Sequence, residues 1–229
     1  VQKDTIARDI PLSVICALLL LGLGYLALGD AHGMILGHLD GAVFLGAFAG
    51  YIFYMIRIAL KASKEGKKVE VEGGSDDEIR LISVPLSILF IIGGAIAIAV
   101  GGDVTVDAAS RIAGDLGMSQ TLIGLTIVSI GTSLPELVTS IVAARKNEVD
   151  MALGNAIGSN IFNILFILGM SATISPLHIL SESVIDCVIL LVSGILLFVF
   201  AYTKKSMNRT EGAICVLSYI GYTAYLFIR

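Results

Sequence analysis

The residue best suited to ion chemistry is Glu136, because it stands inside a long apolar segment. It lies about nine residues before the basic pair Arg145-Lys146, which corresponds to roughly 13 Å of helix. The hydrocarbon core of a bilayer is about 30 Å thick, so this spacing predicts a carboxylate deep in the membrane. A charged side chain in the bilayer costs several kcal/mol of free energy, and such residues normally bind a cation, a proton or a substrate. Glu136 is therefore the first candidate for a functional site.

Further oxygen-bearing side chains recur around Glu136 at helical spacing. Pro135 cannot donate to the carbonyl of Gly131, so we expect a kink that frees the carbonyls of Gly131 and Thr132. Carbonyl, hydroxyl and carboxylate oxygens together suit Na⁺ or Ca²⁺. Alternatively, the hydroxyls bond back to their own helix and the proline only bends it. One helix face carries Ser129, Ser133, Glu136 and Ser140, with Thr132 and Thr139 beside it.

A second polar group follows in the next apolar segment. Asn155, Ser159 and Asn163 are spaced i, i+4, i+8, and Asn160 lies on the same segment. The small residues Gly154 and Gly158 would let another backbone approach closely. The alternative for the amides is plain hydrogen bonding between helices.

The composition predicts an all-α integral membrane protein. Of 229 residues, 56% are hydrophobic, and the mean hydropathy is +0.91. Charged residues make up 15%, below the roughly 25% of soluble domains. The apolar runs do not alternate with period 2, which disfavours a β-barrel. We expect about seven transmembrane helices, near residues 10–29, 41–60, 82–100, 119–144, 151–172, 184–202 and 211–228.

The polar stretches between these spans set the expected organisation. Residues 61–80 read as a cytoplasmic linker between a two-helix part (1–60) and a five-helix part (81–229), whose central polar segment covers about 119–172. Gly101-Gly102-Asp103 is expected to end the third span. Residues 105–117 are then expected to form an amphipathic segment against the membrane or the bundle.

Basic residues predict the orientation. With seven spans, 13 Lys and Arg residues fall on one side and 2 on the other. The positive-inside rule then places the N-terminus of the chain in the cytoplasm and its C-terminus outside a cell membrane. The net charge of −4 gives no indication of nucleic-acid binding. The three cysteines are interpreted as packing residues, and the three histidines fall in predicted loops.

Two stretches carry a resemblance to a known family. Gly131-Thr-Ser-Leu-Pro-Glu136, followed by Gly154-Asn-Ala-Ile-Gly-Ser-Asn160-Ile-Phe-Asn163, resembles an alpha-repeat of the calcium/cation antiporter superfamily. It is most similar to the prokaryotic sodium/calcium exchangers. The resemblance implies a ten-helix fold of two inverted five-helix halves, each with one repeat, and exchange of Na⁺ for Ca²⁺ by alternating access. The transported ions would be Ca²⁺ and Na⁺, with no other cofactor.

The resemblance also implies roles for individual residues. Glu136 matches the Ca²⁺-binding glutamate of the second repeat, and Asn163 matches a position that is Asp in some members. The ion-binding candidates are then Glu136, Thr132, Ser133, Ser129, Ser159, Asn163 and Asn160, with Ser129 and Ser159 at Na⁺ sites.

A single repeat supplies only part of the ligands that such a site needs. Ca²⁺ takes six to eight oxygen ligands, and one repeat supplies one carboxylate. The family's first three helices have no counterpart here, and residues 1–60 resemble its fourth and fifth. We expect the missing first repeat to come from a longer form of the same chain or from a second chain.

Other functions remain open at this stage. A Ca²⁺/H⁺ or other cation/proton antiporter of the same superfamily is the nearest alternative, and an ion channel or a seven-helix receptor is another. An intramembrane enzyme with Ser133 as nucleophile would need a His or Lys base at matching depth, and the spans show none. A secondary transporter rather than an enzyme is therefore expected.

Overall fold

The computed structural model describes residues 5–26, 34–64, 83–204 and 207–228. Internal contacts divide the chain into two compact units. Unit 1 comprises Val1–Glu72 and Val149–Glu211, and unit 2 comprises Gly73–Glu148 and Gly212–Arg229. Each unit is treated by itself.

The described residues are almost entirely helical. Six helices are long and apolar enough to cross a membrane, and a seventh span results if the bent pair Gly124–Thr132 and Leu134–Arg145 counts as one. This confirms the expected class of a membrane protein with about seven transmembrane helices. Most of the expected 61–80 linker and His32 lie outside the described residues.

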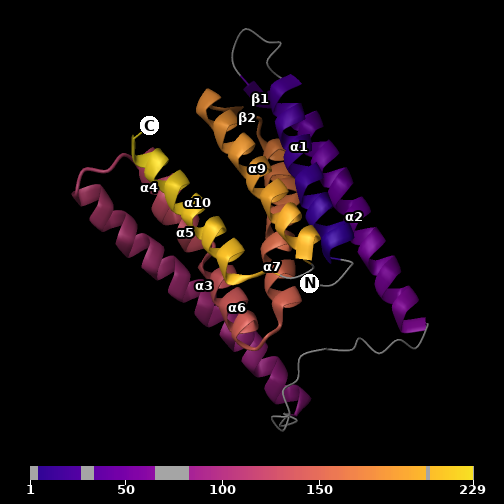
Figure 1. Cartoon of the computed structure of the whole chain (residues 1–229). Helices are drawn as coiled ribbons and strands as arrows, with labels where there is room; N and C mark the ends of the chain where they lie inside the picture. Colours follow the sequence, from indigo (N-terminus) through magenta and orange to yellow (C-terminus); the bar gives the residue numbers. More distant parts are fainter. Residues whose placement is uncertain (1–4, 27–33, 65–82, 205–206, 229) are drawn as a thin grey trace. The chain divides into compact units, whose positions relative to one another are not determined.

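Unit 1 is built around two pairs of neighbouring helices. A short π-helix, η1 (Thr5–Asp9), leads into α1, which lies alongside α9 (Figure 1), and α2 packs on α8. The buried core includes Ile10, Phe44, Ile161 and Leu165. The helices of this unit are α1 (Ile10–Leu26), α2 (His38–Lys64), α7 (Val149–Phe162), the π-helix η4 (Asn163–Leu168), α8 (Gly169–Ile174) and α9 (Ser181–Lys204).

Glycines bring α2 and α8 into close contact. A Cβ atom on Gly41 would lie 2.5 Å from the backbone N of Thr173 and 2.7 Å from the carbonyl O of Gly169. Only a hydrogen fits there, so the backbones approach directly. The close approach expected at Gly154 and Gly158 is not found among the described residues, where no atom lies within 4 Å of a Cβ built on either.

Two short strands join one end of unit 1, although only helices were expected. Strand β1 (Met34–Leu36) pairs antiparallel with β2 (Leu177–Ile179), with Ile35 opposite His178 (Figure 1). Two strands alone are marginal in water, but Leu36 is fully buried here. The expectation that the histidines lie in loops is wrong for His178 in β2 and for His38, which begins α2. His38 Nδ1 lies 2.9 Å from the carbonyl O of Thr173, to which it donates.

Unit 2 is organised along one long helix, α3 (Val84–Asp115). Its neighbours are α4 (Gln120–Ile123), the π-helix η3 (Gly124–Val128), α5 (Ser129–Thr132) and α6 (Leu134–Arg145). The last helix, α10 (Arg209–Ile228), belongs to this unit from Gly212 onward. Its start is held by reciprocal hydrogen bonds between Asn208 and Glu211, at 2.8 and 2.9 Å.

The continuity of α3 corrects the expected break after residue 100. Two glycines weaken a helix by about 1 kcal/mol each, yet Gly101 and Gly102 lie inside 32 continuous helical residues. The residues expected to form a separate amphipathic segment, 105–117, are therefore mostly the second half of α3. The real stop is Gly117, whose φ of 86° permits the bond from Met118 N to Ala113 O, 3.0 Å long.

Candidate functional site

Glu136 lies in the first turn of α6, directly after a break in the helix. The axes before and after the break differ by 49°, and the change occurs at Ser133, with φ −94° and ψ 2°. Pro135 stands at the start of α6, where its missing N–H is least costly. The predicted kink is thus confirmed. It places the carboxylate near the N–H groups of a helix start, which stabilise negative charge.

The backbone at the break forms a tight turn. Ser133 N donates to the carbonyl O of Ile130 at 3.1 Å, a bond of 3₁₀ type. In a regular helix the carbonyl of Gly131 would accept from the N–H of residue 135, which proline lacks. That the carbonyl of Gly131 is available to a cation therefore stays a prediction.

The hydroxyl groups of this segment lie close to the carboxylate in sequence and space. Thr132 Oγ1 donates to the carbonyl O of Ser129 at 3.1 Å, as the back-bonding alternative predicted. Ser129, Thr132 and Ser133 are exposed in the described chain, whereas the Oε2 atom of Glu136 is buried. The bent segment therefore gathers one carboxylate and several neutral oxygens, which are ligands for hard cations.

The helix α3 supports this segment through a contact that sequence reasoning missed. A Cβ atom on Gly131 would lie 1.8 Å from Cγ2 of Val106, so α3 and α5 touch at this glycine. One turn further along α3, Ser110 has a buried hydroxyl oxygen without a hydrogen-bond partner in the part of the chain that the structure describes. The four-residue spacing of Val106 and Ser110 puts both on one helix face, which was the available signal, but residues 105–117 were expected to form a separate amphipathic segment against the membrane or the bundle.

The second polar group lies on α7 and the start of η4 in unit 1. Asn160 and Asn163 are exposed, and Ser159 Oγ donates to the carbonyl O of Ala156 at 3.0 Å. The opposite side of the same segment is buried, with Ile157 and Ile161 at 2% and 1% exposure. The core of unit 1 thus takes the apolar side and leaves the amides outward.

The candidate residues are brought together in two groups. Unit 2 carries Ser129, Thr132, Ser133 and Glu136, and unit 1 carries Ser159, Asn160 and Asn163. Within the described ranges, no three His, Cys, Asp or Glu side chains are grouped so that they could hold a metal ion. An ion bound by either group would rely on a single carboxylate at most, and otherwise on neutral oxygens.

Both polar segments also contain a π-turn that the sequence did not indicate. The π-helix η3 ends directly before Ser129, and η4 begins at Asn163. Such turns are rare and occur often at functional sites, because they shift the helix register and loosen backbone bonding. No residue pattern distinguishes these turns from ordinary helix.

Comparisons with known proteins cover most of the chain. A family model described as "Sodium/calcium exchanger protein" matches residues 86–228. The chain is 35% identical to a putative antiporter CaxA of Alkalimonas amylolytica, covering 99% of this chain and 70% of that protein. It is 39% identical to the sodium/calcium exchanger MaX1 of Methanosarcina acetivorans, over 57% of this chain and 38% of that one.

A solved structure gives the same picture for the fold. The sodium-calcium exchanger NCX_Mj superposes with a TM-score of 0.70 at 29% identity, over 99% of this chain and 67% of that one. The chain therefore spans about two thirds of the length of this exchanger and of the putative antiporter.

Proposed function

Because the chain belongs to the sodium/calcium exchanger family, we propose that it exchanges Na⁺ for Ca²⁺ across a membrane, with Glu136 as the central ligand. The observation that carries this proposal is the 49° bend that presents the carboxylate at the start of α6. A divalent ion leaving water needs charge compensation, and Glu136 is the carboxylate among the candidate ligands.

The neutral oxygens complete the proposed site. Thr132 and Ser133 offer carbonyl or hydroxyl oxygens to Ca²⁺, and Ser129 offers one to Na⁺. In the second segment, within unit 1, Ser159, Asn160 and Asn163 offer hydroxyl and amide oxygens of their own to the transported ions. Since Na⁺ and Ca²⁺ both take oxygen ligands, loading one ion weakens the site for the other. That competition converts a binding site into an exchanger when access alternates between the two sides.

A second acidic motif completes this site in the proposal. One carboxylate cannot balance two positive charges in a medium of low dielectric constant. We place the partner carboxylate on a first alpha-repeat, in a longer form of this chain or in a second chain. Inverted-repeat transporters bind their ions where two repeats meet near the midplane.

The test is the substitution Glu136→Gln in the full-length protein. Gln keeps the size and polarity but removes the charge, so Na⁺-driven Ca²⁺ uptake into vesicles should fall below detection. The matched control is Glu148→Gln, which removes a carboxylate just beyond the end of α6 and should transport normally. Uptake above one tenth of wild type in Glu136→Gln, with normal expression, would reject Glu136 as the central ligand.

Replacing the sodium gradient by a proton gradient separates the nearest alternative. The several hydroxyls near Glu136 favour Na⁺, because a proton needs fewer oxygen ligands. Uptake driven by pH alone would identify a Ca²⁺/proton antiporter, and Ca²⁺ flux without any opposing gradient would identify a channel.

The orientation remains the one that basic residues predict. We place the N-terminus of the chain and residues 61–80 in the cytoplasm. An impermeant thiol reagent should label a cysteine at Ser75 in inverted vesicles and fail to label it in intact cells, and the reverse result would invert the topology.

A further inference from the structure

Two apolar cavities flank the same stretch of α1 within unit 1. One, of about 460 Å³, lies between α1 and α2 and is lined by Leu12, Tyr51 and Tyr54 among others. The other, of about 220 Å³, lies between α1 and α9 against Ile195 and Phe198. Pro11 and Ile15 line both cavities and form a narrow ridge between them.

The larger cavity has one cationic residue at the end where α1 begins. Arg8 lines it and forms an ion pair with Asp9, with Nε 2.7 Å from Oδ1. Leu19 marks the opposite end, about eleven residues or roughly 16 Å further along the helix. The cavity is therefore elongated and otherwise mostly apolar, with a charged group and two tyrosines along its wall.

We propose that unit 1 binds one anionic diacyl phospholipid across the Pro11–Ile15 ridge. One acyl chain fills each cavity, and the phosphate lies beside Arg8. Two cavities that share one ridge suit two chains joined at a glycerol. A transmembrane helix lying on the ridge is the competing occupant, and it would leave no lipid retained.

Headgroup charge supplies the preference among lipids. Lipid tails are as apolar as the cavities, so the acyl chains gain mainly close packing. The guanidinium of Arg8 adds attraction for an anionic phosphate, although Asp9 reduces it. Lys61, seven residues beyond Tyr54, continues the same face of α2 and brings further positive charge to that end.

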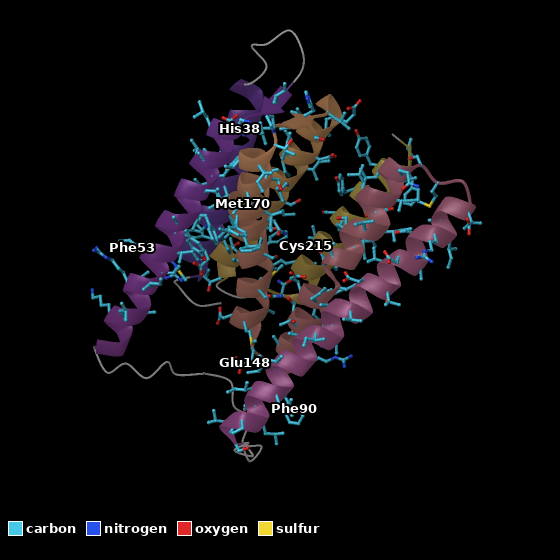
Figure 2. All side chains as sticks on the ribbon, turned by 180° about the vertical axis from the view of Figure 1, so that it is seen from behind. His38, Phe53, Phe90, Glu148, Met170 and Cys215 are labelled. Carbon is cyan, nitrogen blue, oxygen red and sulfur yellow. The ribbon has the colours of Figure 1, made fainter. Side chains whose placement is uncertain are left out.

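Native mass spectrometry of the full-length protein in detergent tests the proposal. Dioleoyl phosphatidylglycerol should bind about fivefold more tightly than dioleoyl phosphatidylcholine, and Arg8→Gln should remove that difference. The matched control is Arg145→Gln, which removes a basic residue that lies in the last turn of α6, three residues before Glu148 (labelled in Figure 2), and that lines neither cavity. It should keep the preference.

Filling the cavities tests the two-chain geometry. Ile15→Trp, which occupies the ridge, should abolish retention of one phosphatidylglycerol, and Ile195→Trp should weaken it by closing the smaller cavity. The second variant keeps the test intact if the first fails to fold. A lysolipid with one chain should bind more weakly than the diacyl form. Equal binding of the two headgroups, unchanged retention in both Trp variants, or the absence of any retained lipid would overturn the proposal.

Discussion

The two polar segments of the molecule differ in how their helices carry polar side chains. Residues 120–145 of unit 2 break at Ser133 and carry a carboxylate, whereas residues 151–174 of unit 1 are helical without proline and carry hydroxyls and amides. The break gives Glu136 a helix start, whose N–H groups stabilise its charge. Neutral Asn163 needs no such support. The bend therefore occurs in the segment that carries the charged Glu136. Neutral polar side chains, as in the second segment, do not require a bend.

The close glycine contacts of the two segments differ as well. In unit 1, Gly41 and Gly169 meet backbone against backbone. In unit 2, Gly131 meets the side chain of Val106. Backbone atoms that contact a glycine cannot move unless their helix shifts. A side chain that contacts a glycine can be replaced by a smaller one. The two contacts should respond differently to the same added methyl group.

The largest effect is expected for Gly41→Ala. The new Cβ would lie within 2.7 Å of two backbone atoms of α8, so α2 must shift, and we expect a loss of about 3 kcal/mol in the free energy of unfolding. Denaturant titration of the purified protein in detergent measures it. Gly46→Ala, on the same helix with nothing within 4 Å, is the control and should raise the free energy of unfolding by up to about 1 kcal/mol, because alanine favours a helix. Equal stability of the two variants would disprove the close contact.

Gly131→Ala should cost less and should be repairable. The added methyl group overlaps Cγ2 of Val106, and we expect a loss of about 2 kcal/mol by the same titration. Val106→Ala in the same protein should recover at least half of that loss, because it removes the overlapping atom. Gly124→Ala has open space around it and should show no loss of stability. Failure of Val106→Ala to rescue would place the clash elsewhere.

Pro135→Ala removes the structural difference between the two segments. The restored N–H can donate within the helix, so the 49° bend should relax, with Ca²⁺ affinity reduced about tenfold. Spin labels at Leu125 and Arg145 should move apart. Pro85→Ala, at the start of α3, is the control and should leave that distance unchanged. An unaltered label distance in Pro135→Ala would mean that packing, not proline, maintains the bend.

The smallest effect on stability is expected for Asn163→Asp, which adds a negative charge to the second segment. Asn163 is exposed, so folding should be unaffected, but a second carboxylate should change the Na⁺ dependence of Ca²⁺ transport several-fold. Gln120→Glu adds the same charge at the start of α4 and should have no effect. Unchanged Na⁺ dependence would assign Asn163 a structural role.

Local rules in the sequence determined the spans, the kink and the two polar groups. Hydropathy places apolar runs in a membrane whatever their neighbours are, and Pro135 removes its own hydrogen bond in any environment. The i, i+4, i+8 spacing places Asn155, Ser159 and Asn163 on one helix side, and the buried Ile157 and Ile161 occupy another. These features depend on residues within a few turns of each other.

Contacts between residues far apart in the sequence decided the length of α3, the strand pair and the buried polar and apolar sites. The helix α3 continues through Gly101 and Gly102 because its second half packs on α5, where Val106 meets Gly131. The pairing of β1 with β2 joins segments that lie more than a hundred residues apart. The buried hydroxyl of Ser110 and the two cavities beside Pro11 likewise arise from neighbouring helices. Helix propensity is a weak preference, and tertiary packing overrides it wherever two helices gain close contact.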